Sequence, residues 1–133
     1  MQLTGTTNEG RALNLGQQYK GKVVLIQYWS TNCQPCIEDM AKIKDLVAKY
    51  GRDGFFVIGV NLDNQKKDML AFLQKNKLSW PQLWEDGGLD SRFANEMGIL
   101  TMPTMILIDK QGKVANRGIH ISQVGEQVQG LLH

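Results

Sequence analysis

The sequence has few cysteines and few histidines: two of each in 133 residues. Two cysteines are too few for the disulfide framework of a small secreted scaffold, and a chain of this length does not need one to form a core. The histidines, His120 and His133, stand far from the cysteines, so the Cys and His spacings of a zinc site are absent. Cysteine content alone leaves the redox compartment open.

The sequence also lacks clustered positive charge and long apolar runs. Its net charge is +2, and Lys66-Lys67 and Lys75 with Lys77 are separate pairs, so no nucleic-acid partner is expected. No apolar run approaches the ~18–20 residues needed to cross a bilayer. The N-terminus has neither the basic start nor the apolar stretch of a signal peptide. With 42% hydrophobic and 21% charged residues, the composition is that of a folded globular protein.

Two apolar runs predict buried strands. Lys22–Trp29 and Gly54–Asn61 are rich in β-branched and aromatic residues, which is typical of strands covered on both faces in a mostly parallel sheet. Between them, apolar residues recur at helical spacing from Cys36 to Tyr50. Strand, helix and strand form a βαβ unit, for which a right-handed crossover is expected.

The rest of the chain alternates between shorter elements. Asp109–Gly112 is a four-residue turn closed by glycine, which predicts a β-hairpin. No internal repeat or linker interrupts the pattern, so the fold class is α/β and residues 1–133 are expected to form a single domain. The other elements are expected at Leu3–Leu15 (two small strands), Lys66–Asn76 (helix), Trp80–Trp84 (edge or strand start), Leu89–Met97 (helix), Thr104–Ile108 with Lys113–Arg117 (hairpin), and Ser122–Leu132 (helix).

The two cysteines, Cys33 and Cys36, stand three positions apart in the stretch WSTNCQPC. A disulfide across so short a loop would restrict the unfolded chain little, because loop-closure entropy grows with loop length. A zinc site needs about four ligands. A peroxidatic cysteine is expected within P-x-x-x-[ST]-x-x-C, and Ile26 stands where that pattern needs proline. Structural, zinc-binding and peroxidatic roles are therefore disfavoured relative to a redox pair beside a βαβ unit.

The placement of Cys33 favours redox chemistry on physical grounds. The strand ends at Trp29 and the helix is expected to begin near Cys33, where unpaired N–H groups and the positive end of the helix dipole stabilise a thiolate. Pro35 suits the first turn, since the N–H that it lacks has no partner there. Cys36 lies on the same face, one turn deeper. We therefore expect Cys33 to attack a disulfide and Cys36 to resolve the intermediate.

These residues resemble a known family. The stretches KVVLIQYWSTNCQPC and, about seventy residues later, TMPTMILIDKQGKV are similar to thioredoxin-fold proteins. More narrowly, they resemble the TlpA/ResA-like thiol–disulfide oxidoreductases of the AhpC/TSA-Redoxin superfamily, over roughly Leu3 to Leu132. The resemblance implies a thioredoxin-like fold with a central mixed β-sheet flanked by helices. It also implies an N-terminal β-hairpin and a central helical insert, here Lys66–Asn76.

The resemblance implies an enzyme that reduces protein disulfides through a mixed-disulfide intermediate. Proline before the second cysteine is typical of reducing relatives. No metal or organic cofactor is implied, because the redox group is the Cys33–Cys36 disulfide itself. The implied partners are protein disulfide or dithiol substrates and an upstream electron donor. The resemblance further implies a location outside the cytoplasm, periplasmic or membrane-anchored and facing outward, with a leader or tether before residue 1.

The resemblance also assigns residues around the cysteines. Pro103 is expected to be a cis-proline beside the pair, and the alternative is an ordinary proline at a strand start. Met102 would offer its backbone N–H and C=O to an extended substrate segment. Trp29 is also expected to pack under the loop. The residues expected at the substrate-binding surface are Trp29, Asn32, Gln34, Pro35, Met102 and Pro103.

A third catalytic residue is expected at Asp39. Thioredoxins carry a buried acid two residues before the tryptophan, and this chain has Gln27 at that position. ResA-like proteins instead have a carboxylate three residues after the second cysteine, where Asp39 stands. Helical spacing places Asp39 on the Cys36 side and turns Glu38 away. We expect Asp39 to exchange protons with Cys36, and the alternative is that it only favours the helix dipole.

A function of another class also fits the sequence. A redox-sensing or non-catalytic thioredoxin-like module would bind extended peptides or report redox state without turnover. Retention of both cysteines disfavours an inert module and is compatible with a sensor. Catalytic turnover of a protein disulfide distinguishes the enzyme from both.

Overall fold

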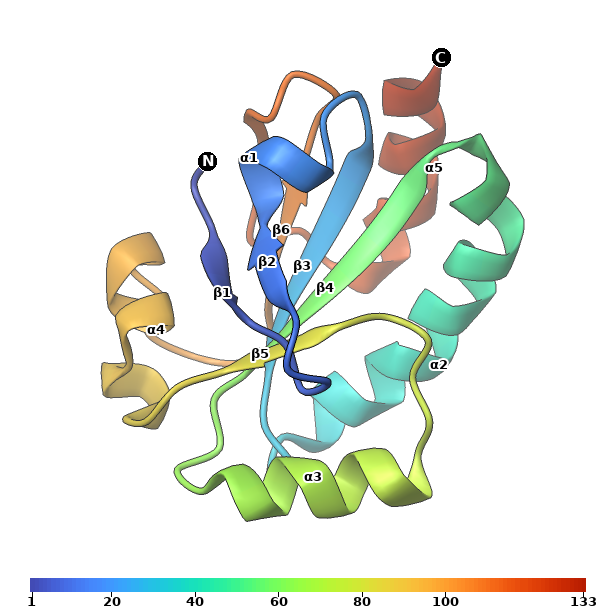
Figure 1. The fold of residues 1–133 in the computed structure, drawn as a ribbon. Helices are drawn as coiled ribbons and strands as arrows, with labels where there is room; N and C mark the ends of the chain where they lie inside the picture. The colour runs from blue at the N-terminus through green and yellow to red at the C-terminus, as the bar shows by residue number, and fades with distance from the viewer.

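A five-stranded mixed β-sheet lies at the centre of the structure (Figure 1). The computed structural model describes residues 1–133. The strand order is β5-β4-β3-β6-β7, with β3, β4 and β5 parallel and with β6 and β7 each antiparallel to the strand before it in the sheet. The strands are β3 (Val23–Trp29), β4 (Phe55–Asn61), β5 (Gln82–Trp84), β6 (Thr104–Ile108) and β7 (Val114–Arg117).

Helices cover both faces of this sheet. Figure 1 shows α2 and α5 against one face, and α1, α4 and a small antiparallel hairpin of β1 and β2 on the other. None of the helices combines the length and the apolar character that a membrane-spanning helix requires. The elements are β1 (Thr4–Thr6), β2 (Ala12–Asn14), α1 (Leu15–Gln18), α2 (Gln34–Tyr50), α3 (Lys66–Lys75), α4 (Arg92–Met97), α5 (Ile121–Leu132) and two 3₁₀ turns, Gly51–Asp53 and Gly88–Asp90.

Burial of the central strand β3 explains the largely apolar run at its sequence position, in which Gln27 is the one amide. All seven of its residues are buried, because it pairs with β4 on one side and β6 on the other and is covered on both faces. Val24, Ile26 and Tyr28 pack toward the hairpin and α4, whereas Val23 and Leu25 pack toward α2 and α5. The predicted α/β fold, with a mixed sheet, N-terminal hairpin and inserted helix, is confirmed.

The long helix α2 follows the predicted apolar spacing. Its buried residues are Cys36, Met40, Ile43 and Tyr50, which share the face that lies against the sheet. Pro35 lies in the first turn, where no backbone donor is required. Apolar spacing and a proline-compatible start thus place the helix where the sequence predicts it.

Side-chain caps account for the places where the structure departs from the prediction. The short helix α1 was not expected, and it begins where the Asn14 side chain accepts a hydrogen bond from Gln17 N at 3.1 Å. The helix expected over Leu89–Met97 is divided into a 3₁₀ turn and α4. The division falls at Ser91, whose hydroxyl accepts a hydrogen bond from Ala94 N and starts α4 as a separate element.

Gly59 in the middle of β4 allows a close approach from the edge strand. It pairs with Gln82 of β5, and a Cβ at this position would overlap the Gln82 side-chain amide. Gln82 is buried and accepts a hydrogen bond from Trp29 Nε1 at 2.8 Å. The lack of a side chain at Gly59 therefore makes room for Gln82, which hydrogen-bonds to Trp29 at the end of β3.

Replacing Gly59 by alanine should lower the free energy of unfolding by about 2 kcal/mol. The new Cβ would force the Gln82 side chain to move, which strains or breaks its hydrogen bond with Trp29 Nε1. Urea unfolding measures the effect. The matched control is Gly130→Ala on α5, where a Cβ meets no atom within 4 Å. This control should raise the free energy of unfolding by up to about 1 kcal/mol through helix propensity. Equal stability of Gly59→Ala and wild type would contradict the packing argument.

Candidate active site

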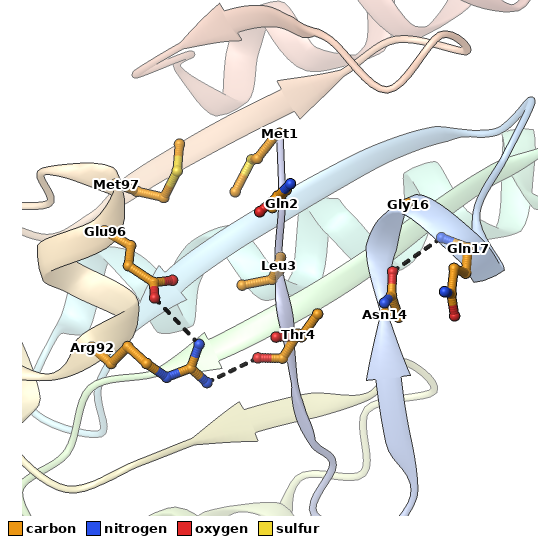
Figure 2. Close-up of a pocket in the computed structure, with 10 residues that line it drawn as sticks. All are labelled: Met1, Gln2, Leu3, Thr4, Asn14, Gly16, Gln17, Arg92, Glu96 and Met97. Atoms are coloured by element: carbon orange, nitrogen blue, oxygen red, sulfur yellow. Dashed lines mark hydrogen bonds and ion pairs between the residues drawn. The ribbon is translucent and has the colours of Figure 1, made fainter.

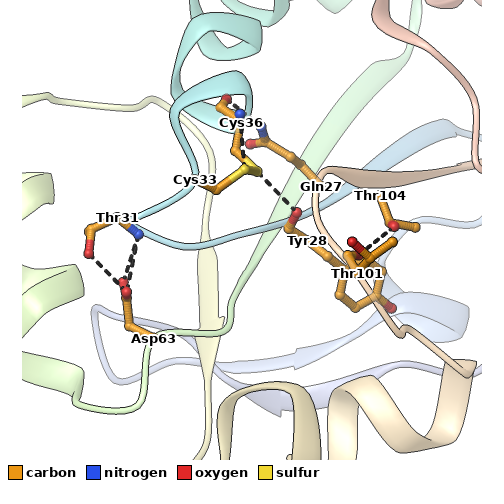
Figure 3. The surroundings of a disulfide bond; sticks show 8 residues. All are labelled: Gln27, Tyr28, Thr31, Cys33, Cys36, Asp63, Thr101 and Thr104. Carbon is orange, nitrogen blue, oxygen red and sulfur yellow. Dashed lines mark hydrogen bonds between the residues drawn. A yellow bond between two sulfur atoms is a disulfide. The ribbon is translucent and has the colours of Figure 1, made fainter.

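Cys33 and Cys36 form a disulfide at the start of α2, with an S–S distance of 2.06 Å and a Cα–Cα distance of 5.3 Å (Figure 3). Cys33 is the N-cap of the helix, and its Sγ accepts a hydrogen bond from Cys36 N at 3.2 Å. Cys33 is half-buried, whereas Cys36 has no exposed surface. The outer cysteine thus meets both solvent and the N–H groups of the helix start, and the inner one lies beneath it.

This geometry suits thiol–disulfide exchange. An N–H aimed at the Cys33 sulfur, together with the positive end of the α2 dipole, stabilises negative charge on that sulfur. The Cys36 sulfur lies 3.9 Å from the backbone oxygen of Tyr28, which gives a reduced Cys36 thiol a nearby acceptor. The arrangement therefore supplies a reactive outer sulfur and a shielded inner one.

Two buried amides lie near the end of β3. Gln27 has no exposed surface, and its Nε2 donates to the Cys36 backbone oxygen at 2.9 Å. Strand register places Gln27 beside Gly59 and Gly59 beside Gln82, so the two amides come from β3 and β5 across the glycine. The β3 side chain that hydrogen-bonds to the first turn of α2 is thus an uncharged amide, as the sequence indicates.

The expectation that Trp29 contributes to the substrate-binding surface is wrong, because its side chain has no exposed surface. Its ring packs against Phe72 of α3 with 5.1 Å between ring centroids, and its Nε1 is bonded to Gln82. The ring also belongs to a small buried cluster with Cys36 and Met69. Trp29 therefore supports the cysteine loop from below, in the packing role that the sequence also predicts.

The other residues expected around the cysteines lie at the surface. Asn32, Gln34 and Pro35 are exposed next to Cys33. The Met102–Pro103 peptide bond is cis. Cys33 and the half-buried Met102 pack against the same cluster, which contains Trp29 and Cys36, so the structure brings this segment to the cysteines.

The segment that contains Met102 and Pro103 keeps unused backbone groups. The backbone N–H and C=O of Met102 make no hydrogen bond within the chain. On either side, Thr104 Oγ1 donates to Thr101 O at 2.7 Å, which ties the segment to the start of β6 (Figure 3). The Met102 main chain thus has a donor and an acceptor that the fold does not consume.

The two acidic residues after Cys36 differ in the way that helical spacing predicts. Asp39 is half-buried and Glu38 is exposed. Burial raises the pKa of the Asp39 carboxyl above its ordinary value, while nearby His120 and Lys42 act in the opposite direction. Asp39 makes no hydrogen bond or ion pair with its side chain. A carboxyl with a raised pKa keeps its proton to higher pH, which suits a group that exchanges protons.

Sequence reasoning missed a polar contact on the other side of the loop. Asp63 is buried two residues after the end of β4, and its carboxylate accepts hydrogen bonds from Thr31, two residues before Cys33. A signal for it was available, because parallel strands β3 and β4 end at the same edge of the sheet. A carboxylate that follows the second strand therefore falls beside the loop that follows the first.

A large cavity lies away from the cysteines. Figure 2 shows this hollow, of about 740 Å³, between the N-terminal segment, Asn14–Gln17 and α4, and neither cysteine lines it. Arg92 at its rim is engaged by Glu85, Glu96 and the backbone oxygen of Thr4. No group of three or more His, Cys, Asp or Glu side chains is placed to hold a metal ion.

Comparison with known proteins assigns the chain to a family. Residues 1–131, nearly the whole chain, match the Redoxin family. The chain belongs to the Redoxin family. It is similar to the thiol-disulfide oxidoreductase ResA of Bacillus thuringiensis subsp. konkukian, with 32% identity over 127 residues that cover 96% of this chain and 70% of that protein. The Geobacillus thermodenitrificans ResA is 32% identical over 106 residues, 80% of this chain and 59% of that protein.

Solved structures of similar proteins have the same fold as this Redoxin chain. A putative thiol:disulfide interchange protein DsbE from Chlorobium tepidum superposes with a TM-score of 0.89 and 25% identity, over 100% of this chain and 94% of that one. A thiol-disulfide oxidoreductase from Bacteroides fragilis gives 0.87 and 27%, over 98% and 97%. The predicted thioredoxin-like fold and family are confirmed, and the disulfide-bonded pair makes this Redoxin protein a thiol–disulfide oxidoreductase.

Iodoacetamide should label Cys33 of the reduced protein at least about tenfold faster than Cys36, because only Cys33 is accessible and stabilised as a thiolate at the helix start. Mass spectrometry of digests taken over time at mildly acidic pH measures both rates. In guanidinium the two rates should converge, since burial and the helix are lost. Faster labelling of Cys36 in the folded protein would reverse the assignment.

Proposed function

We propose that this protein reduces disulfide bonds in other proteins, with Cys33 as the attacking cysteine and Cys36 as the resolving one. The observation that carries the proposal is the contrast between the two sulfurs of one disulfide. Cys33 is half-buried at the N-terminus of α2, and Cys36 is fully buried one turn further in. That contrast gives each cysteine one step of the exchange.

The proposed reaction transfers two electrons in two steps. The Cys33 thiolate attacks one sulfur of the substrate disulfide, so a mixed disulfide forms and the other substrate sulfur leaves as a thiolate. Cys36 then loses its proton and attacks the Cys33 sulfur. The second substrate sulfur is released, and the Cys33–Cys36 disulfide forms. The substrate gains two electrons and two protons, and a separate electron donor returns the enzyme to the dithiol.

The substrate is proposed to bind as an extended segment along Met102. Support comes from the unpaired backbone N–H and C=O of that residue, which a short added strand would satisfy. The exposed residues Asn32, Gln34, Pro35 and Pro103 would complete the contact surface around Cys33. Main-chain recognition of this kind fits a protein that accepts disulfides in varied sequences.

Asp39 is proposed to take the proton of Cys36 when the mixed disulfide is resolved. Support comes from its spacing three residues after Cys36 on α2, which helical geometry assigns to the Cys36 side, from its half-buried side chain and raised pKa, and from its lack of a hydrogen-bond or ion-pair partner. Gln27, which lies in β3 and hydrogen-bonds to Cys36 O, carries an amide and does not titrate. The proton therefore needs another acceptor, and Asp39 is the half-buried acid on the same helix.

The proposed location is outside the cytoplasm, periplasmic or membrane-anchored. Support comes from the similarity to ResA, because the ResA-like family is expected to work outside the cytoplasm. The proposed partners are proteins with exposed disulfides and an upstream dithiol protein that supplies electrons. Both kinds of partner would meet the same half-buried sulfur, that of Cys33.

The wild-type protein should catalyse the reduction of insulin by dithiothreitol, with turbidity rising well before the uncatalysed control. Cys33→Ser should be inactive. Cys36→Ser should accumulate a mixed disulfide through Cys33, because the resolving step is missing, and non-reducing gels with mass spectrometry would identify it. Stoichiometric oxidation of wild type without turnover would instead favour a redox sensor and overturn the proposed enzyme function.

Asp39→Asn should slow resolution of the mixed disulfide by about a hundredfold, the lower end for general acid–base catalysis, because the group is only partly buried. Formation of the mixed disulfide should change far less. In wild type, the resolution rate should fall as pH drops through the raised pKa of Asp39, since the protonated carboxyl cannot accept a proton. The variant should lack this pH dependence.

Stopped-flow measurement of both steps from pH 5 to 9 tests the role of Asp39. Glu38→Gln is the matched control, because it removes an adjacent carboxylate that is exposed on the other side of the helix. Equal resolution rates for Asp39→Asn and wild type would leave Asp39 as a helix-dipole residue. A larger defect in Glu38→Gln would show that the proton acceptor has been placed on the wrong side of α2.

A further inference from the structure

The carboxylate of Asp63 holds the loop that precedes Cys33. Asp63 is 4% exposed and follows the last residue of β4 by two positions. Its Oδ1 accepts from Thr31 Oγ1 at 2.8 Å and from Thr31 N at 3.1 Å, and Figure 3 shows these bonds beside the disulfide. Its Oδ2 accepts from Asn61 Nδ2 at 2.9 Å. Both oxygens are therefore satisfied by specific donors.

Asp63 is itself fixed from two sides. Its backbone N donates to Asn61 Oδ1 at 2.9 Å, and its backbone oxygen accepts from Trp84 Nε1 at 2.8 Å. Asn61 has no exposed surface and ends β4, and Trp84 ends β5. The carboxylate is thus attached to the ends of two parallel strands before it reaches the loop.

No cation compensates this buried carboxylate. The only side-chain ion pairs in the structure are those of Arg92 with Glu85 and Glu96. A buried charge is stable only when hydrogen bonds replace its hydration, and hydrogen bonds to a charged acceptor are stronger than neutral ones. If Thr31 moved away, the buried carboxylate would lose two hydrogen bonds that replace its hydration, which is energetically costly. The loop is therefore held firmly at Thr31.

The held residue lies next to the reactive sulfur in the chain. Thr31 is followed by Asn32 and then Cys33, whose backbone N donates to Ser30 O at 3.1 Å. In the oxidised protein the disulfide also ties Cys33 to Cys36. Reduction breaks the disulfide. The hydrogen bonds between Thr31 and the Asp63 side chain then restrain the segment that leads to Cys33.

We propose that Asp63 is a positioning residue that acts through Thr31 to keep Cys33 at the N-terminus of α2 in the dithiol form. The inference rests on the proposed function, in which Cys33 is the attacking thiolate. Displacement of the loop would move the sulfur away from the Cys36 N–H, so less thiolate would form and its approach to a disulfide would be less well aligned.

The test measures the reaction of iodoacetamide with Cys33 as a function of pH, in which the thiolate displaces iodide and an S–C bond forms. Asp63→Ala should lower the rate constant at pH 7 about tenfold and move the midpoint of the pH profile upward. Loss of negative charge alone would move the midpoint downward by stabilising the thiolate. The direction of the shift therefore separates positioning from simple electrostatics, and a downward shift would overturn the proposal.

Thr31 provides a pair of variants without a change of charge. Thr31→Val removes the hydroxyl donor but keeps the branched shape, and it should slow labelling about threefold with an upward midpoint. Thr31→Ser keeps the donor and should react like wild type. Equal rates in these two variants would overturn the proposal even if Asp63→Ala fails to fold.

Ser91→Ala is the control for a purely structural effect. It also removes a buried side-chain acceptor, at the start of α4 on the other face of the sheet. It should lower the melting temperature and leave the Cys33 pH profile unchanged, whereas a shifted profile would overturn the positioning role.

Iodoacetamide needs no protein substrate, so the labelling test does not depend on the proposed function. If wild type is inactive on insulin but its labelling depends on Asp63, the proposed function would be refuted and this inference would stand. If wild type turns over insulin but Asp63→Ala is labelled at the wild-type rate, this inference would be refuted and the proposed function would stand.

Discussion

Burial of β3 on both faces is the constraint on which the rest of the structure depends. A strand with no solvent-facing side must be covered by helices on one face and by the hairpin and α4 on the other, and it must have a strand on either edge. Its last residue, Trp29, leads directly into the loop of Cys33. Its neighbours β4 and β6 deliver Asp63 and Pro103 to the same region. One apolar strand thus assembles parts of the site from distant segments.

The polar groups beneath the disulfide have to be satisfied within this apolar surrounding. Gln27 and Gln82 each use one amide atom, for Cys36 O and Trp29 Nε1, and each leaves the other atom buried without a partner. Such unpaired buried atoms are uncommon in folded proteins. Gln27 bonds to the first turn of α2, and Gln82 bonds to the last residue of β3. An amide in place of an acid at Gln27 keeps charge out of the buried layer beside Cys36, which is why proton exchange is proposed for Asp39 on the helix.

Local patterns in the sequence predicted most of the elements, because they depend on neighbouring residues only. Apolar runs gave β3 and β4 within one residue of their observed starts, and helical spacing separated half-buried Asp39 from exposed Glu38. The short helix α1 was missed, since four residues stabilised by an Asn14 cap carry no apolar period. The family resemblance supplied the fold, and the match to the Redoxin family bears it out.

By itself, the sequence determined the redox pair and its orientation, because a cysteine that caps a helix and another one turn later follow from spacing and from Pro35 alone. Only the tertiary structure decided what surrounds that pair. Thr31 and Asp63 are separated by 32 positions, and Trp29 and Gln82 by 53. Their contacts exist because β3, β4 and β5 align in one register, and a side chain's burial depends on which strand lies beside it. The family resemblance therefore assigned Trp29 to the substrate-binding surface, whereas the neighbouring strands and helices bury its side chain completely.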